Sequence, residues 1–168
     1  MEFSTEVKDR VFKILGRGKL VVDLVPYINE YIKDNPDTEI QIGCDSQPIG
    51  GVINYAIVIV LYNQGKGGHV LYTKLHVKRE KGSKNKTQDF IKLWREVELS
   101  LALAEYLRMS GCKKVKYIDL DLNPDPMYYS NTVLRSSLGY VTSMGYEPRC
   151  KPDAFSASYC ADRISRTL

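Results

Sequence analysis

The chain has 168 residues, of which 43% are hydrophobic and 26% charged, a balance typical of a globular protein with its own core. Its 24 Lys and Arg against 20 Asp and Glu permit a polyanionic partner without requiring one. The four cysteines (Cys44, Cys112, Cys150 and Cys160) are too scattered for a zinc motif or a disulfide framework, and no apolar stretch is long enough to span a membrane. Free thiols and a start without a secretory leader lead us to expect a cytoplasmic protein.

The first part of the chain is expected to be helical. Residues 3–15 have helical spacing and end at Gly16 and Gly18, and a second helix over 23–34 closes at Asn35-Pro36. Neither helix carries a recognisable site. Residues 1–38 are therefore expected to be a helical extension that covers a core formed by residues 39–168.

The rest of the chain alternates strand and helix patterns. Strands are predicted over 39–44, 52–62, 70–77, 115–122 and 146–151, and helices over 87–109, 130–144 and 154–166. A turn is predicted at 63–68, and a basic loop at 80–86. This order predicts one α/β domain over 1–168, with a mixed five-stranded sheet that contains one antiparallel hairpin strand and is flanked by helices.

Acidic side chains stand where these elements begin or end. Asp45 closes the first core strand, Asp121 lies nearer the end of its strand than Asp119 on the same face, and Asp153 precedes the final helix. Glu98 lies within the long helix. If the first and fourth core strands are parallel neighbours, their ends open into one crevice. Clustered carboxylates repel one another unless a cation intervenes, and oxygen ligands of this kind suit Mg²⁺ or Mn²⁺.

The long helix offers two glutamates for this position. Glu96 and Glu98 point about 200° apart at helical spacing, so only one of them faces the sheet. Glu98 lies nearer the apolar stripe that contains Trp94 and Leu101, which makes it the preferred candidate. The margin between the two is small.

With these residues in view, the chain resembles the ribonuclease-H-like superfamily. More narrowly, it resembles the YkuK-type family in the segments IGCDSQ (42–47), GKGG (65–68), ELS (98–100), DLN (121–123) and GYVTSMGYEPRCKPDAFSASYCAD (139–162). The segment KPDAFSAS is also similar to the lysine-x-aspartate segment of type 2 ribonuclease H enzymes, in which the aspartate binds metal. That similarity favours Asp153 over Asp162 as the fourth carboxylate.

The resemblance implies a site for two Mg²⁺ or Mn²⁺ ions. Asp45 would bridge both ions, Glu98 and Asp121 would hold one, and Asp153 would hold the other. Lys151 would contact the scissile phosphate. The residues expected to bind substrate are Ser46, Gln47, Lys66 and Asn123. From the sequence itself, Lys66 is expected to form an edge that tracks phosphates, together with Lys78, Arg79, Lys81, Lys84 and Lys86.

Two functions from different classes remain open. The first is a metal-dependent nuclease that acts on RNA, an RNA–DNA hybrid or structured DNA. The second is a non-catalytic nucleic-acid-binding or assembly module that retains the fold. Simpler roles compete at single positions, since Asp45 suits a turn and Asp153 a helix N-cap. Tyr128 and Tyr129, beside the expected site, are candidates for base stacking, and the oligomeric state is open.

Overall fold

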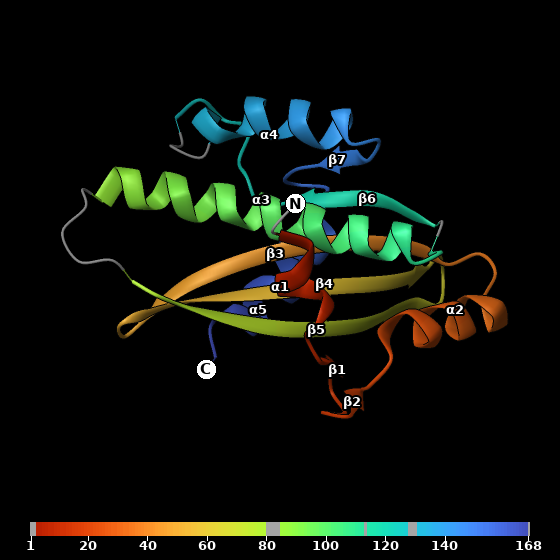
Figure 1. Ribbon diagram of the computed structural model, residues 1–168. Helices are drawn as coiled ribbons and strands as arrows, with labels where there is room; N and C mark the ends of the chain where they lie inside the picture. The colour runs from red at the N-terminus through yellow and green to blue at the C-terminus, as the bar shows by residue number, and fades with distance from the viewer. Residues whose placement is uncertain (1–2, 80–84, 113, 128–130, 168) are drawn as a thin grey trace.

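The computed structural model describes residues 3–79, 85–112, 114–127 and 131–167. The described strands form one sheet of seven strands in the order β2-β1-β5-β4-β3-β6-β7 (Figure 1). The strands are β1 (Phe12–Ile14), β2 (Leu20–Val21), β3 (Glu39–Ile49), β4 (Val52–Asn63), β5 (Gly67–Lys78), β6 (Val115–Leu120) and β7 (Glu147–Arg149). The helices are α1 (Phe3–Lys8), α2 (Leu24–Asp34), α3 (Asn85–Met109), α4 (Asn131–Ser143), the π-helix η1 (Ser156–Ala161) and α5 (Asp162–Ser165).

The mixed α/β fold predicted from the sequence is confirmed. Strands β3, β4 and β5 form an antiparallel meander, while β6 pairs parallel with β3, and β7 pairs parallel with β6. These five strands are the ones expected from the alternating and β-branched patterns. Strand β4 is buried along most of its length because it lies between β5 and β3.

Among the described residues the sheet has seven strands and not five, and the helix predicted over residues 3–15 is wrong. Helix α1 ends at Lys8, and β1 then pairs antiparallel with β5. Phe12 and Ile14 are buried while Lys13 is exposed, which is the period of a strand. The turn into β2 passes through Gly16 and Gly18, at φ 83° and 63°. The unpaired edge of β5 supplies the hydrogen-bond partners that make a strand preferable to a helix here.

Helices cover the two faces of the sheet unequally (Figure 1). On one face, Ile40 and Ile42 of β3 join the main core, to which α3 contributes Leu103 and Leu107. On the other face, η1 and α5 contact β3 and β4, with a small core around Val58. None of the helices within the described ranges has the length and apolar character needed to cross a membrane.

Two predicted boundaries are wrong in ways that matter for the site. The strand predicted to end at Cys44 continues to Ile49, because its pairing with β4 continues to that residue. The single helix predicted over 154–166 is instead the π-helix η1 followed by the short α5. The extra residue in each hydrogen-bonded turn of η1 changes which side chains face the sheet.

Candidate functional site

Asp45 and Asp121 lie at the point where β3 and β6 diverge. The parallel pairing between these strands ends at Cys44 and Leu120, and each aspartate is the next residue. The expectation that the two strands are parallel neighbours is confirmed. Asp45 therefore does not end its strand, which continues to Ile49. It is the first residue of β3 that no longer pairs with β6. This place, between an antiparallel and a parallel neighbour, is a topological switch point, where open α/β sheets bind ligands.

Asp45 is a buried carboxylate in a negatively charged setting. Its residue is 6% exposed, and Ser165 Oγ donates a hydrogen bond of 2.6 Å to its Oδ2. Burial raises the pKa of Asp45, and the charges of Asp121 and Asp162 raise it further. The hydrogen bond from Ser165 and the charge of Lys92 lower this pKa. Like charges held this close are a feature of cation sites.

The glutamate of α3 that contacts β3 is Glu96, through Ser46, so the preferred candidate Glu98 does not hold this position. Glu96 is 5% exposed, and Ser46 Oγ donates to its Oε1 over 2.5 Å. Burial raises the pKa of Glu96 well above its usual range, with Asp45 adding most of the electrostatic repulsion. Glu98 instead lies 3.5 Å from Arg95, with 23% of its side chain exposed.

The carboxylate that η1 and α5 bring toward Asp45 is Asp162 and not Asp153. Asp153 is exposed in the turn before η1, where its backbone N–H donates to the Cys150 carbonyl over 2.8 Å. Asp162 is the first residue of α5, and its charge acts on Asp45. The preference for Asp153 as a metal ligand has no support in this arrangement.

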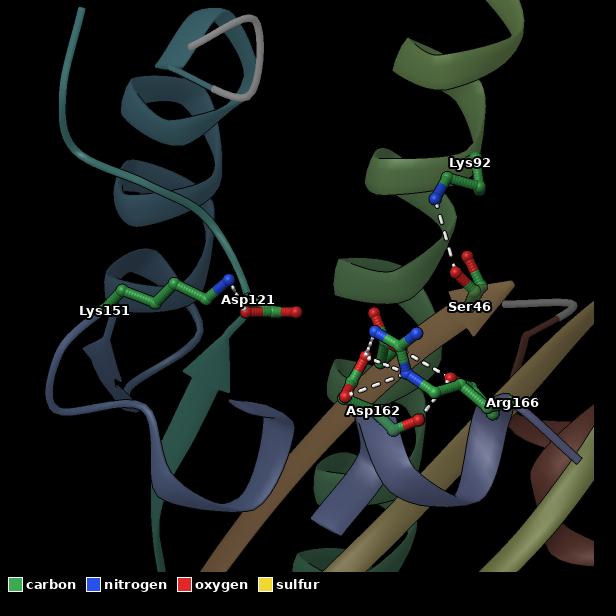
Figure 2. Close-up of polar contacts among 8 residues, drawn as sticks. Ser46, Lys92, Asp121, Lys151, Asp162 and Arg166 are labelled. Atoms are coloured by element: carbon green, nitrogen blue, oxygen red, sulfur yellow. Dashed lines mark hydrogen bonds and ion pairs between the residues drawn. The ribbon is translucent and has the colours of Figure 1, made fainter. Parts of the chain in front are cut away.

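Basic side chains hold two of the carboxylates (Figure 2). Lys151 Nζ lies 2.7 Å from Asp121 Oδ1, and Arg166 donates to both oxygens of Asp162, at 2.7 and 3.1 Å. The pKa of Lys151 is raised by its hydrogen bond to Asp121, and the charges of Asp45 and Asp162 add to this effect. Within the described parts of the chain, no three acidic, His or Cys side chains stand close enough to hold a metal ion in this conformation.

Asp119 has a structural role next to the site. It is 1% exposed and accepts hydrogen bonds from Arg149 Nε (2.8 Å), the Ser156 backbone N–H (2.7 Å) and Ser156 Oγ (2.8 Å). These bonds connect β6 to β7 and to the first turn of η1. Asp119 thereby fixes the segment that leads to α5.

The residues expected to bind substrate are in different environments. Ser46 is fully buried against Glu96, and the side chain of Asn123 accepts a 3.0 Å hydrogen bond from the Asp125 backbone in a turn. Gln47 is partly exposed, two residues beyond Asp45 on the same face of β3. Its role stays a prediction.

The predicted row of cations is wrong in one respect: Lys66 does not lie on the same surface as Lys78 and Arg79. Lys66 lies in the turn between β4 and β5, whereas Lys78 and Arg79 lie at the far end of β5, separated from it by the length of that strand. Asp45 pairs with Ala56 of β4, and the turn that contains Lys66 begins seven residues later, after Asn63. At about 3.3 Å per strand residue, Lys66 is roughly 20 Å or more from the carboxylates. Lys81, Lys84, Tyr128 and Tyr129 lie outside the described residues.

Lys92, Ser165 and Arg166 contact the site but were not foreseen. Lys92 Nζ donates to the Ser46 carbonyl over 3.3 Å (Figure 2), and its charge lowers the pKa of both Asp45 and Glu96. Lys92 precedes Glu96 by four residues, so helical spacing alone would have placed the two on one face. Arg166 has the same relation to Asp162. The contact of Ser165 depends on how α5 docks, which the sequence does not show.

Comparisons with known proteins agree with this topology. A family model described as Ribonuclease H-like matches residues 23–166, which span α2, the five-stranded core and the carboxylates described above. No curated protein and no solved structure matches the chain. The narrower likeness to the YkuK-type family stays a prediction. The chain belongs to the ribonuclease-H-like family.

Proposed function

We propose that the protein is a divalent-metal-dependent nuclease that hydrolyses phosphodiester bonds in RNA, an RNA–DNA hybrid or structured DNA. The observation that carries the proposal is the placement of Asp45, Glu96, Asp121 and Asp162 around the switch point of a ribonuclease-H-like sheet. Asp45 and Glu96 are buried, and burial raises the pKa of each; the charges of Asp121 and Asp162 add to this at Asp45, and those of Asp45 and Asp121 add to it at Glu96. Ionised carboxylates are costly to bury without a cation, so this arrangement favours a metal site over a structural one.

The chemistry of these side chains fits Mg²⁺ or Mn²⁺, because all four supply only oxygen ligands. We propose that Asp45, Glu96, Asp121 and Asp162 would hold such ions. When bound, such ions would lower the pKa of a water molecule and stabilise the charge that develops on the phosphodiester. In the present conformation Asp121 and Asp162 are bound to Lys151 and Arg166. Ion binding therefore requires these two basic side chains to move.

The basic residues have a second use in this proposal. Lys151, once released from Asp121, remains beside the carboxylates and can donate a hydrogen bond to a phosphate oxygen. Lys92 holds the Ser46 carbonyl and offsets the negative charge on Asp45 and Glu96. The same two lysines would favour the approach of a polyanion to an otherwise acidic site.

A non-catalytic nucleic-acid-binding module is the second candidate. The observation that favours it is that Lys151 and Arg166 already neutralise Asp121 and Asp162, as structural ion pairs do. A module of this kind would bind nucleic acid equally well with and without Mg²⁺ and would cleave none.

Cleavage assays separate the two candidates. Labelled single-stranded RNA, double-stranded RNA, RNA–DNA hybrid and branched DNA are incubated with the protein in Mg²⁺, Mn²⁺ or EDTA. We expect cleavage of at least one substrate with metal, none in EDTA, and loss of cleavage in Asp45→Asn. Asp153→Asn is the matched control and should retain activity. Cleavage by Asp45→Asn at the wild-type rate would contradict the proposed site, and binding without cleavage in any metal would favour the module.

A further inference from the structure

A row of residues crosses the sheet from the carboxylates to a pair of lysines. Asp45 on β3 pairs with Ala56 on β4, and Ala56 pairs with Lys74 on β5. Directly paired residues point to the same face of a sheet, so Asp45 and Lys74 share the face that η1 and α5 partly cover. Two strand spacings separate them by roughly 10 Å.

Lys74 lies in a groove of about 450 Å³ between β1, β5 and the residues after α5. We call it the lysine groove; its polar lining includes Lys13, Lys74, His76 and Thr167, with Tyr72 as the aromatic residue. Lys13 pairs with Tyr72 and is exposed on the same face as Lys74. No acidic side chain is among the described residues that line this groove.

The two lysines are close enough to repel each other. Burial lowers the pKa of Lys74, and the charge of Lys13 lowers it further. The guanidinium of Arg10 adds a third cation nearby, because its Nη1 donates to the Lys74 carbonyl over 2.9 Å. Cations gathered without an acidic neighbour in their groove favour the binding of an anion.

The lysine groove is joined to the carboxylates through the residues that follow α5. Lys74 Nζ donates to the carbonyl and, over 2.9 Å, to the Oγ1 of Thr167. Two residues earlier, Ser165 donates to Asp45. The buried Asn54 side chain ties these residues together, because its Nδ2 donates to the Ser165 and Thr167 carbonyls over 2.7 and 2.9 Å. A ligand in the groove and one at Asp45 therefore contact the same short segment.

We propose that the lysine groove binds a backbone phosphate of the nucleic-acid strand whose reacting phosphodiester lies at the carboxylates. This inference rests on the proposed function and extends it to the path of the substrate. A separation of roughly 10 Å suits phosphates a few nucleotides apart on one strand, since successive charges of a duplex strand are about 3.4 Å apart along its axis. Because residues 165–167 contact both Asp45 and Lys74, a ligand that reaches both places is favoured, and this means a polymer rather than a free phosphate ion. Strand β1 lies outside residues 23–166, so the contribution of Lys13 comes from the segment that precedes the family match, whereas Lys74 lies within it.

Fluorescence anisotropy with a labelled oligo(U) strand tests the proposal on the whole chain, in EDTA so that no cleavage occurs. We expect Lys13→Gln to weaken binding about fivefold and to make the slope of log K against log salt shallower by about 0.7, the value of one lost phosphate contact on a single strand. Lys13→Glu should weaken binding further. Lys74→Arg keeps the charge and should keep the slope, whereas Lys74→Gln should reduce it.

Lys33→Gln is the matched control, because Lys33 is an exposed lysine on α2 that does not line the groove; it should leave the affinity unchanged. Equal affinities for the wild type and Lys13→Gln would overturn the assignment of phosphate binding to the lysine groove. The nuclease proposal would not be affected by that result. Competition by inorganic phosphate as effective, per phosphate, as unlabelled oligo(U) would show a free-anion site and overturn the assignment to a strand. Failure of the wild type to bind oligo(U), RNA–DNA hybrid and branched DNA would overturn both proposals.

Discussion

Replacing Glu96 by Gln should stabilise the metal-free protein at neutral pH. Glu96 is 5% exposed, and burial followed by repulsion from Asp45 raises its pKa well above the usual range. A carboxyl group whose pKa rises on folding contributes stability below its unfolded pKa of about 4.3. That stability is lost as the pH rises through the folded pKa. Glutamine does not ionise, so the variant should not lose it.

The size of the effect follows from two opposing contributions. Each unit by which folding raises the pKa lowers the free energy of unfolding by about 1.4 kcal/mol at a pH above the folded value. Against this, the 2.5 Å hydrogen bond from Ser46 loses its charged acceptor, at a cost of about 1 kcal/mol, although the glutamine Oε1 still accepts it. Because burial raises this pKa well above its usual range, we expect the first contribution to exceed the second, so the variant is the more stable. For a chain of this length each 1 kcal/mol of gain raises Tm by about 2–4 °C.

Thermal melts in EDTA across acidic to mildly alkaline pH measure this effect. The melting temperature of the wild type should fall with rising pH more steeply than that of Glu96→Gln. Glu98→Gln is the control: its partly exposed pair with Arg95, at 3.5 Å, is worth at most about 1 kcal/mol, so its pH profile should follow the wild type. Equal pH profiles for the wild type and Glu96→Gln, or a lower Tm for this variant at mildly alkaline pH, would refute the reasoning.

Three further outcomes are expected. Mg²⁺ at a hundredfold excess over Kd should raise the unfolding free energy of the wild type by about 2.7 kcal/mol, and its Tm accordingly. Asp162→Asn should reduce this rise in Tm, whereas Asp153→Asn should leave it unchanged. The opposite ranking would restore Asp153 as a ligand. Asn54→Ala removes two hydrogen bonds, of 2.7 and 2.9 Å, to carbonyls near the end of the chain, and should cost about 2–4 kcal/mol in urea unfolding; a loss under about 1 kcal/mol would contradict that anchoring role. Phe12→Ala, at a fully buried position on β1, should cost about 3–5 kcal/mol, and a change typical of an exposed residue would argue against β1 as part of the core.

The five core strands could be predicted because their signals are local. Strand β4 is rich in β-branched residues and turns sharply into β5, and the order of elements then restricts the topology. The extension was misread because Val7, Val11 and Ile14 also suit a helical spacing. Only the free edge of β5, a feature of the folded sheet, decides that this segment is a strand.

The candidate site was predicted for the strand residues and not for the helical ones. Asp45 and Asp121 follow from the pairing of β3 with β6. Glu96 was missed because Trp94 was taken as a marker of the sheet-facing side, whereas Trp94 stacks on Tyr140 of α4 with ring centroids 5.8 Å apart. The segment begins as a π-helix, whose period differs from that of an α-helix. The α-helical period therefore could not predict the direction in which Asp162 points.

The parallel pairing of β3 with β6 also has a kinetic consequence. The meander of β3, β4 and β5 joins neighbours in the chain through short turns, whereas β6 reaches β3 only after the whole hairpin and α3 have intervened. Contacts between distant segments carry a larger loop-closure cost, so they are expected to form later in folding than the hairpins. We therefore expect low φ-values for side chains between β6 and β3 and higher ones within the meander. The proximity of Asp45 and Asp121 would then be acquired late, so their repulsion should speed unfolding more than it slows folding.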